Sequence, residues 1–506
     1  MKSFTLVAFL AVTAAHARFN AVHAHADFVK RQQGTVVVGA PTSASSASSH
    51  SRAHTTAAAT ATGSPAGSPT GAGGRVASSP LASLSKIGTT TTAEATHALP
   101  TTYAAGATPP VARAPKLPAI ATLNPAMYPA LDLTPPVDSP EVQQWLSEID
   151  MDNIPDIPPT QVGGCANSSN ADALANGGED GSCWWTCGGC TRATDITFCP
   201  TKADWGASFD DGPSPYTPRL LNLLDSQNLK STFFIVGSRA ISRPEMIQYE
   251  YMTGHQLSIH TWAHPSLTTL TNEEIVAELG WTKKVIHDIT GVTPNTMRPP
   301  YGDIDDRVRY IALQMGLRPI IWTQYESQQF DTRDWQIGGG VVSAPDVYNN
   351  FEKFLSTAST HLTTGFIVLA HDLYQQSVDL AVDYILPGAI NQGILNIKTI
   401  ASCLGEGLEQ SYIETNDNST AVVQTSATVA GATGVGFVPG VGLSAGGGSS
   451  TSKISKTSST RSPNSSAGGA AESNTAGGTS GASRGMVASA VLGTTLVAGA
   501  VVVAMA

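Results

Sequence analysis

Charged residues are scarce in this sequence. Asp, Glu, Lys and Arg make up 13% of its 506 residues, about half of the quarter that is usual in globular chains. The 28 Lys and Arg are outnumbered by 39 Asp and Glu, giving a formal net charge of -11. No basic stripe is visible, and binding to nucleic-acid phosphates depends on one. We therefore expect no nucleic-acid partner.

Apolar periodicity is also missing from much of the chain. The hydrophobic fraction is 41%, but much of it is alanine within residues 18–138 and 416–485, which are rich in Ser, Thr, Ala, Pro and Gly. Such stretches cannot bury enough apolar surface to fold. In a secreted chain they are typical of O-glycosylated stalks. We therefore expect disordered stalks on both sides of one folded domain.

The N-terminal residues 1–17 have the pattern of a secretory signal peptide. An apolar run at 4–15 follows a positive residue and closes on a small-x-small cleavage sequence, and it is too short for a membrane-spanning helix. The nearby pair Lys30-Arg31 is either a dibasic processing site or a chance pair, and the sequence leaves this open.

The C-terminal residues 486–506 carry no charge, and no Lys or Arg follows them as would be usual for a transmembrane helix. Small residues and a polar Gly/Ser spacer precede this tail. That order predicts a glycosylphosphatidylinositol (GPI) signal whose tail is replaced by lipid. Asn474 is the expected attachment residue, with Ser473 or another small residue up to Ser483 as alternatives. A plain C-terminal span is the alternative for the tail itself.

The segment 139–415 differs from its surroundings, because it holds all six cysteines and all eight tryptophans. An even cysteine set in an oxidising compartment predicts disulfides, whose pairing the sequence does not choose. Cys187-Gly-Gly-Cys190 would also suit a zinc ribbon, but a second pair of ligands is not evident. Three Asn-x-Ser/Thr sequences predict N-glycosylation, at Asn167, Asn418 and Asn464.

Short apolar strands alternate with amphipathic helices in this segment. The expected strands are 205–209, 231–236, 256–259, a short one at Met297, 319–323 and 366–370. The expected helices are 217–228, 272–289, 306–315, 345–360 and 377–385. Such alternation predicts a parallel α/β fold with right-handed crossovers, and about seven units in one domain favour a barrel over an open sheet.

Polar clusters follow the carboxyl ends of these strands, where parallel β/α folds place their active sites. They are Asp210-Asp211, His260 with His264, Arg298, Asp331 with Asp334, and His371-Asp372. Two histidines four residues apart and one carboxylate can form a three-ligand metal site with open positions for water. Asp211, His260 and His264 are therefore the candidate ligands. The alternative is a surface histidine pair beside an Asp-Asp-Gly-Pro turn.

The remaining groups suggest acid–base chemistry. While Asp211 binds a metal, its neighbour Asp210 would lie close enough to take a proton from an attacking water. His371 is the candidate acid for the leaving group, with Asp334 placed to tune its pKa. The residues by themselves thus indicate metal-assisted hydrolysis.

Five motifs occur in a fixed order: SFDDGPSPYTP, HTWAHPSL, RPPYGD, DTRDW and LAHD. Together they resemble the motifs of the polysaccharide deacetylase (NodB-like, carbohydrate esterase family 4) domain. HTWAHPSLTTLTNEEIVAEL in particular looks like the fungal chitin deacetylases. The resemblance covers residues 203–400. Ser208 is a minor departure, because Thr is usual before Phe-Asp-Asp.

The resemblance implies a distorted (β/α)7 barrel and metal-dependent removal of acetyl groups from the N-acetylglucosamine units of chitin, giving chitosan. The cation would be zinc or cobalt. The implied roles are these: Asp210, general base; Asp211, His260 and His264, metal ligands; Arg298, orienting the base; Tyr301, binding the oxyanion through its backbone N–H; Asp334, tuning the general acid His371; Trp335 and Leu369, lining the slot for the acetyl methyl.

Together these features lead us to expect a monomeric extracellular enzyme, held by a GPI lipid at the plasma membrane and cell wall. Two alternatives remain open. One is the same hydrolase acting on another acetylated glycan, and the other is a non-catalytic wall or chitin-binding protein. No compact cysteine-dense binding module is visible, and no expected catalytic residue is missing, which counts against the second.

Overall fold

The computed structural model describes residues 76–91 and 97–417. The predicted signal peptide, Lys30-Arg31, Asn418, Asn464, Asn474 and the apolar tail 486–506 lie outside these residues and stay predictions. Among the described residues, no helix is both long and apolar enough to cross a membrane.

In the described part of the chain the strands are short, and the eight that form the two main sheets are parallel. They are β1 (Asp204–Gly206), β2 (Ser208–Asp210), β3 (Thr232–Ile235), β4 (Gln256–Ile259), β5 (Thr296–Met297), β6 (Arg318–Pro319), β9 (Phe366–Ile367) and β10 (Asn396–Lys398). One sheet has the order β2-β3-β4-β5-β6, and a second has β10-β1-β9. A separate antiparallel hairpin consists of β7 (Gln324–Tyr325) and β8 (Gln328–Gln329).

Single backbone bridges close these sheets into a barrel. β1 and β2 form one extended segment that pairs with β3 on one side and with the β9 segment on the other, where Asp210 bridges His371. On its other side the β9 segment pairs with the chain that follows β6. The Thr323 N–H donates to Ile367 O at 3.0 Å, and Asp331 forms a bridge with Leu369. The predicted α/β barrel is thus present, in a distorted form.

One predicted strand, 319–323, is regular only at its start. Its backbone N–H groups donate to three different segments. Ile320 donates to Met297, Ile321 to Ile196 and Thr323 to Ile367. Because the segment changes neighbours here, it has no continuous ladder with one partner.

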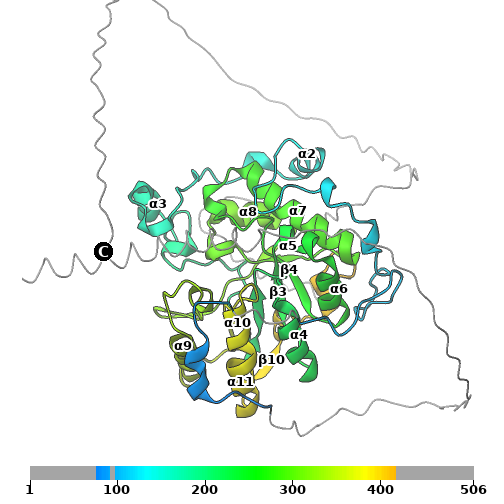
Figure 1. The fold of residues 1–506 in the computed structure, drawn as a ribbon. Coiled ribbons are helices and arrows are strands. Elements are labelled where there is room, and N and C mark those ends of the chain that lie inside the picture. The colour runs from blue at the N-terminus through cyan, green and yellow to red at the C-terminus, as the bar shows by residue number, and fades with distance from the viewer. Residues whose placement is uncertain (1–75, 92–96, 418–506) are drawn as a thin grey trace, which may run out of the picture. The chain divides into compact units, whose positions relative to one another are not determined.

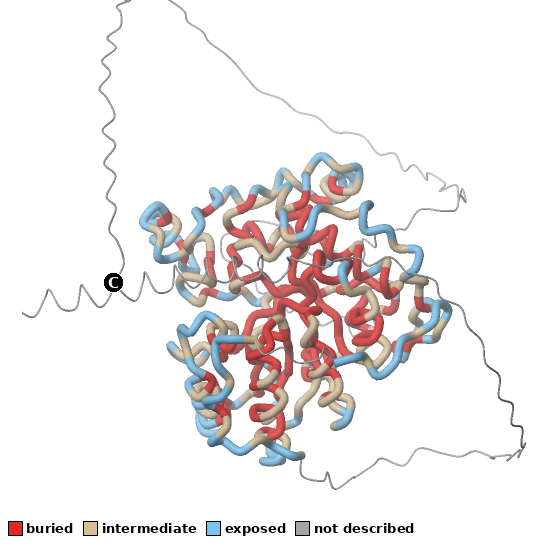
Figure 2. Tube along the Cα trace, viewed as in Figure 1, coloured by how far each residue is buried: buried red, intermediate tan, exposed pale blue. Residues whose placement is uncertain are grey.

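The helices surround the strands (Figure 1). They are α2 (Pro140–Ser147), α3 (Ala171–Ala175), α4 (Thr217–Ser226), α5 (Gly237–Ser242), α6 (Pro244–Met252), α7 (Asn272–Thr290), α8 (Asp306–Gln314), α9 (Ala344–Thr360), α10 (Gln375–Leu380), α11 (Leu386–Gln392) and α12 (Ile400–Cys403). Figure 2 shows that buried residues concentrate on the strands and on the helix faces that cover them. That layering exposes the polar helix faces and hides the apolar strands.

The sequence determines both ends of α7, the longest predicted helix. The Thr271 side chain accepts from the Glu274 N–H, and the Glu274 carboxylate accepts from the Thr271 N–H, which is a capping box. Gly291, at φ 82°, ends the helix in the left-handed conformation that glycine adopts without a Cβ penalty.

The folded unit begins earlier than residue 139, the boundary expected from composition. Leu84, Val111 and Leu117 are buried against the barrel, and the Tyr128 ring stacks on that of Trp262 at 6.2 Å. This correction has a physical cause. The segment packs as irregular chain, so its few apolar residues show no helical or strand periodicity, although each finds a place in the core.

All six cysteines form disulfides, as predicted, and the zinc-ribbon alternative is excluded. The pairs are Cys165–Cys187, Cys183–Cys190 and Cys199–Cys403. The last bond joins the segment before β1 to α12, so it links the beginning and the end of the barrel.

The three bonds should differ in their effect on stability. Cys199–Cys403 spans 204 residues and Cys183–Cys190 spans 7, so their loss should cost about 5 and about 2 kcal/mol if disulfides act mainly on the entropy of the unfolded chain. The free energy of unfolding in urea of the two Cys→Ala double variants checks this. Equal losses would contradict the expectation.

Candidate active site and metal centre

The predicted site begins where β2 ends. Asp210 is the last residue of β2 and is 1% exposed. Asp211 follows it in the left-handed conformation, at φ 77°, and is completely buried. Its N–H donates to Phe234 O at 3.2 Å, and the Arg239 guanidinium donates to its carbonyl oxygen at 2.6 Å. Hydrogen bonds to its N–H and to its carbonyl oxygen therefore hold the unfavourable backbone conformation of Asp211. Because of that conformation, the side chains of Asp210 and Asp211 point in different directions.

The three candidate metal ligands lie together. Asp211 Oδ1 is 3.0 Å from His264 Nε2 and 3.4 Å from His260 Nε2, and one ligand atom from each residue can be chosen so that all three lie within 4.8 Å of one another. A carboxylate oxygen and two imidazole nitrogens at this spacing suit a divalent cation such as zinc.

The protonation states also suit a cation. Burial alone would raise the pKa of Asp211, but the facing His264 and His260 outweigh it and hold that pKa well below its usual value. Burial lowers the pKa of His264, although Asp211 opposes the shift. An ionised carboxylate beside a neutral imidazole is the form in which these groups bind metals.

The backbone orients His260. Its Nδ1 lies 2.7 Å from the carbonyl oxygen of Arg298, an acceptor that requires the proton to be on Nδ1. The lone pair of Nε2 then faces Asp211. A metal-binding histidine usually donates the N–H of its other ring nitrogen to such an acceptor. The residues present therefore fit a metal ion.

The loop between the two histidines is held by a buried carboxylate that sequence reasoning missed. Thr261 and His264 both have left-handed backbones, at φ 65° and 61°. Glu278 of α7 is fully buried, and its Oε2 accepts from Trp262 N–H at 2.7 Å and Ala263 N–H at 2.8 Å. No local signal marked Glu278, because it lies within an ordinary helical pattern.

The predicted base, Asp210, is paired with Arg298. Arg298 Nη1 donates to Asp210 Oδ1 at 2.6 Å and to Ser208 Oγ at 3.0 Å. The guanidinium lies 3.9 Å above the centre of the Phe234 ring and has no exposed surface. Arg298 therefore fixes the Asp210 carboxylate, whose other oxygen is 3.9 Å from His260 Nε2.

The predicted acid, His371, is paired with Asp334. Its Nδ1 is 2.7 Å from Asp334 Oδ1, and its own N–H donates to Asp334 Oδ2 at 2.9 Å. Burial would lower the pKa of His371, but Asp334 and the nearby Asp211 and Asp210 outweigh it and raise that pKa to about 10. The raised pKa therefore favours the protonated imidazolium at neutral pH. A cation bound to Asp211 would offset part of the rise, whereas the Asp334 contact would remain.

The other predicted residues lie around this centre. The Tyr301 backbone is left-handed, at φ 60°, and its ring is 4.7 Å from the His264 ring. Trp335 follows Asp334 and donates its N–H to Asp334 Oδ1 at 2.9 Å. Leu369 is 7% exposed, two residues before His371. Asp331, in contrast, accepts from the Arg333 N–H in its own turn, outside the His371–Asp334 pair.

Two further residues support the site: Arg239, which carried no sequence signal, and Asp372, which the sequence placed at a strand end without a role. Arg239 has Nη1 at 3.9 Å from Asp211 Oδ1, in addition to its bond to the Asp211 backbone. Asp372 accepts from the Thr217 hydroxyl, and its backbone oxygen accepts from Ser214 Oγ at 2.6 Å. Burial raises the pKa of Asp372 to about 7. Arg239 thus anchors Asp211 itself, and Asp372 anchors the chain that follows it.

The predicted glycosylation residue Asn167 lies at a half-buried position. Its Nδ2 donates to Val162 O at 2.8 Å, and its Oδ1 accepts from Ser169 N–H at 2.9 Å. Glycosylation there stays a prediction.

The chain is similar to proteins of one known family. The family model for Polysaccharide deacetylase matches residues 199–320. Chitin deacetylase 1 of Cryptococcus neoformans var. grubii is 56% identical over 364 residues, which cover 71% of this chain and 75% of that protein. Chitin deacetylase 2 of Cryptococcus neoformans var. neoformans is 37% identical over 249 residues, covering 47% and 52%. A solved chitin deacetylase from Colletotrichum lindemuthianum is 27% identical and aligns with 43% of this chain and 94% of its own, at a TM-score of 0.39.

Metal binding should depend on the three grouped ligands. We expect the metal-stripped protein to bind one Zn²⁺ or Co²⁺, and Asp211→Asn or His264→Gln to weaken binding at least ~100-fold, because each removes a direct ligand. Isothermal titration calorimetry measures this. The matched control is His287→Gln, since the His287 side chain is 46% exposed and its partners are Asp288 and Glu414. Unchanged affinity in the ligand variants would place the metal elsewhere.

Proposed function

Since this chain belongs to the polysaccharide deacetylase family, we propose that it is a metal-dependent chitin deacetylase. It hydrolyses the N-acetyl groups of N-acetylglucosamine units in chitin and releases chitosan and acetate. The observation that carries the proposal is the convergence of three units at one end of the barrel: the Arg298–Asp210 pair, the ligand set of Asp211, His260 and His264, and the Asp334–His371 pair.

Asp210 is proposed as the general base. Its carboxylate lies next to the metal ligands, so a water between Asp210 and the acetyl group can give it a proton. A divalent cation bound by Asp211, His260 and His264 would supply Lewis-acid activation of water and carbonyl oxygen. Arg298 holds the carboxylate in one orientation throughout, because its guanidinium is itself locked by Ser208 and the Phe234 ring.

His371 is proposed as the general acid. The water oxygen forms a bond to the carbonyl carbon, and the charge that develops on the carbonyl oxygen is stabilised by the Tyr301 backbone N–H. Cleavage of the C–N bond then needs a proton on the nitrogen. The raised pKa of His371 favours its protonated form, and Asp334 holds the ring, so His371 supplies this proton and the amine leaves as the glucosamine unit. Trp335 and Leu369 are proposed to line the slot for the acetyl methyl.

The metal is proposed to be zinc or cobalt. Two imidazole nitrogens and one carboxylate oxygen form the ligand set of many catalytic zinc sites, in which water completes the coordination. Cobalt accepts the same donors and similar geometry, so the donor set supports both ions.

Acetate release tests the activity. We expect the purified protein to release acetate from chitin oligomers, to lose this activity on chelation, and to regain it with Zn²⁺ or Co²⁺. Asp210→Asn should lower kcat at least ~100-fold, because the proton acceptor is lost. Asp172→Asn, at an exposed position on α3, is the matched control. No release by folded, metal-loaded protein would leave other acetylated glycans or a binding role.

The protein is also proposed to be secreted and held at the cell surface by a GPI lipid, as a monomer acting on wall chitin. The supports are the signal-like 1–17 segment, the uncharged 486–506 tail and the small residues around Asn474. Treatment of expressing cells with phosphatidylinositol-specific phospholipase C should release the protein into the medium. Retention on the membrane would favour a plain C-terminal span.

A further inference from the structure

Asp303 is a buried carboxylate with no place in the mechanism above. It follows Tyr301 and Gly302 and is 3% exposed. Both of its oxygens accept hydrogen bonds from other parts of the chain. Oδ1 accepts from Trp184 Nε1 at 2.8 Å and Thr186 Oγ1 at 2.7 Å. Oδ2 accepts from Thr268 N–H at 3.0 Å and Thr268 Oγ1 at 2.7 Å.

These donors come from two separate segments. Thr268 lies four residues after His264, at the end of the loop that carries this ligand. Trp184 and Thr186 lie in the disulfide-bonded segment 165–190, which precedes the barrel in sequence. Asp303 therefore joins three pieces of chain: the loop of Tyr301, the loop of His264 and the disulfide-bonded segment. Charged hydrogen bonds of this kind are stronger than neutral ones.

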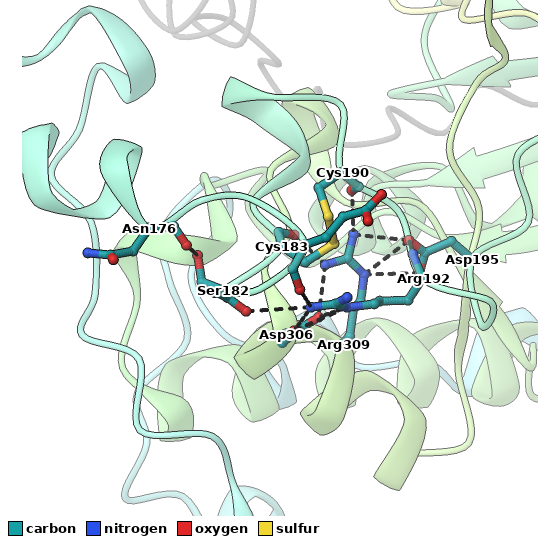
Figure 3. Close-up of a disulfide and its surroundings, with 10 residues drawn as sticks. Asn176, Ser182, Cys183, Cys190, Arg192, Asp195, Asp306 and Arg309 are labelled. Atoms are coloured by element: carbon teal, nitrogen blue, oxygen red, sulfur yellow. Dashed lines mark hydrogen bonds and ion pairs between the residues drawn. A yellow bond between two sulfur atoms is a disulfide. The ribbon is translucent and has the colours of Figure 1, made fainter. Parts of the chain in front are cut away.

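The disulfide-bonded segment is itself firmly attached to the barrel (Figure 3). Cys183–Cys190 closes it on one side of Trp184, and Cys165–Cys187 on the other side of Thr186. Arg309 of α8 donates to Cys183 O at 2.6 Å and to Cys190 O at 3.1 Å, so it binds the backbone at both ends of the Cys183–Cys190 loop. The donors to Asp303 are thus preorganised.

The same segment packs on the Tyr301 loop. The Trp185 ring contacts Trp322 at 4.6 Å between ring centres, and any Cβ at Gly302 would collide with it. The Trp185 N–H donates to Ile304 O at 3.0 Å. Tyr301 has a left-handed backbone, at φ 60°. For a residue other than glycine, such a conformation persists only when its surroundings impose it.

We propose that Asp303, together with the disulfide-bonded segment 165–190, is a positioning unit that sets the Tyr301 backbone against the His264 loop. It acts on the proposed oxyanion donor and on one metal ligand at once, because the Tyr301 and His264 rings are in contact. The kinetic part of this inference rests on the proposed deacetylase function, whereas its metal-binding part does not.

The test removes donors to Asp303, and Thr186→Val does so with almost no change of side-chain shape, whereas Trp184→Phe also shortens a buried ring. Thr186→Val deletes one hydroxyl and Trp184→Phe deletes one ring N–H, and the double variant deletes both donors to Oδ1. Thr186→Ser keeps the hydroxyl and serves as the rescue. Arg192→Gln is the matched control. Arg192 follows the disulfide-bonded segment in sequence and pairs with Asp306, and it does not contact Asp303.

Steady-state kinetics on chitin oligomers should show a loss in kcat with little change in KM. Each single variant should lower kcat about threefold to tenfold and the double variant about 10- to 50-fold, because small misplacements of transition-state donors are costly. Thr186→Ser should recover most of the wild-type kcat. Arg192→Gln should change kcat less than about twofold, whatever its effect on the melting temperature.

Co²⁺ binding gives a second readout that needs no activity. The double variant should bind Co²⁺ about threefold to tenfold more weakly and show altered visible absorption bands, because the His264 loop is displaced. A double variant with wild-type kcat and Co²⁺ spectrum but a lowered melting temperature would overturn the proposal and leave Asp303 purely structural. If the wild-type protein releases no acetate, the proposed function fails, and the Co²⁺ measurements alone decide on the positioning unit.

Discussion

The site depends on the buried contact between Arg298 and Asp210. Arg298 has no exposed surface, and one residue does two things: its side chain fixes the proposed base, and its carbonyl oxygen orients His260. Breaking a buried ion pair by removing one partner typically costs about 3–5 kcal/mol, since a charge is left uncompensated, so loss of either residue should destabilise the protein strongly. Burial of Arg298 is tolerable because Asp210, Ser208 and the Phe234 ring surround the guanidinium.

Unfavourable backbone conformations gather around this pair. Asp211, Thr261, His264 and Tyr301 are all left-handed, although none is glycine. Each is held by contacts from elsewhere: Arg239 binds the Asp211 carbonyl, and Glu278 binds the loop between the histidines. Strain of this kind is stored at sites where side chains must converge at an angle that regular structure does not offer. The barrel thus uses buried carboxylates and guanidinium groups on its helices to shape loops at its strand ends.

The residues of the candidate site were predictable because each carried a local signal. Asp210-Asp211, His260 with His264, and His371 follow short apolar strands, and the carboxyl ends of parallel strands meet at one edge. The supporting residues had no such signal. Glu278 lies in an ordinary helix, Arg239 at the start of one, and the packing of 76–138 depends on apolar residues spaced without period.

The sequence by itself determined the alternation of the main strands and helices, the α/β class, and which residue types stand at the strand ends, but it did not predict α5, α6 or β10. What it determined follows from periodicity, turn residues and the chemistry of individual side chains. Only the tertiary structure decided the disulfide pairing, the support of the histidine loop by Glu278, and the union of three segments at Asp303. Contacts between residues more than a hundred positions apart, such as Trp184 and Asp303, leave no trace in local pattern, because they depend on how the fold brings distant segments together.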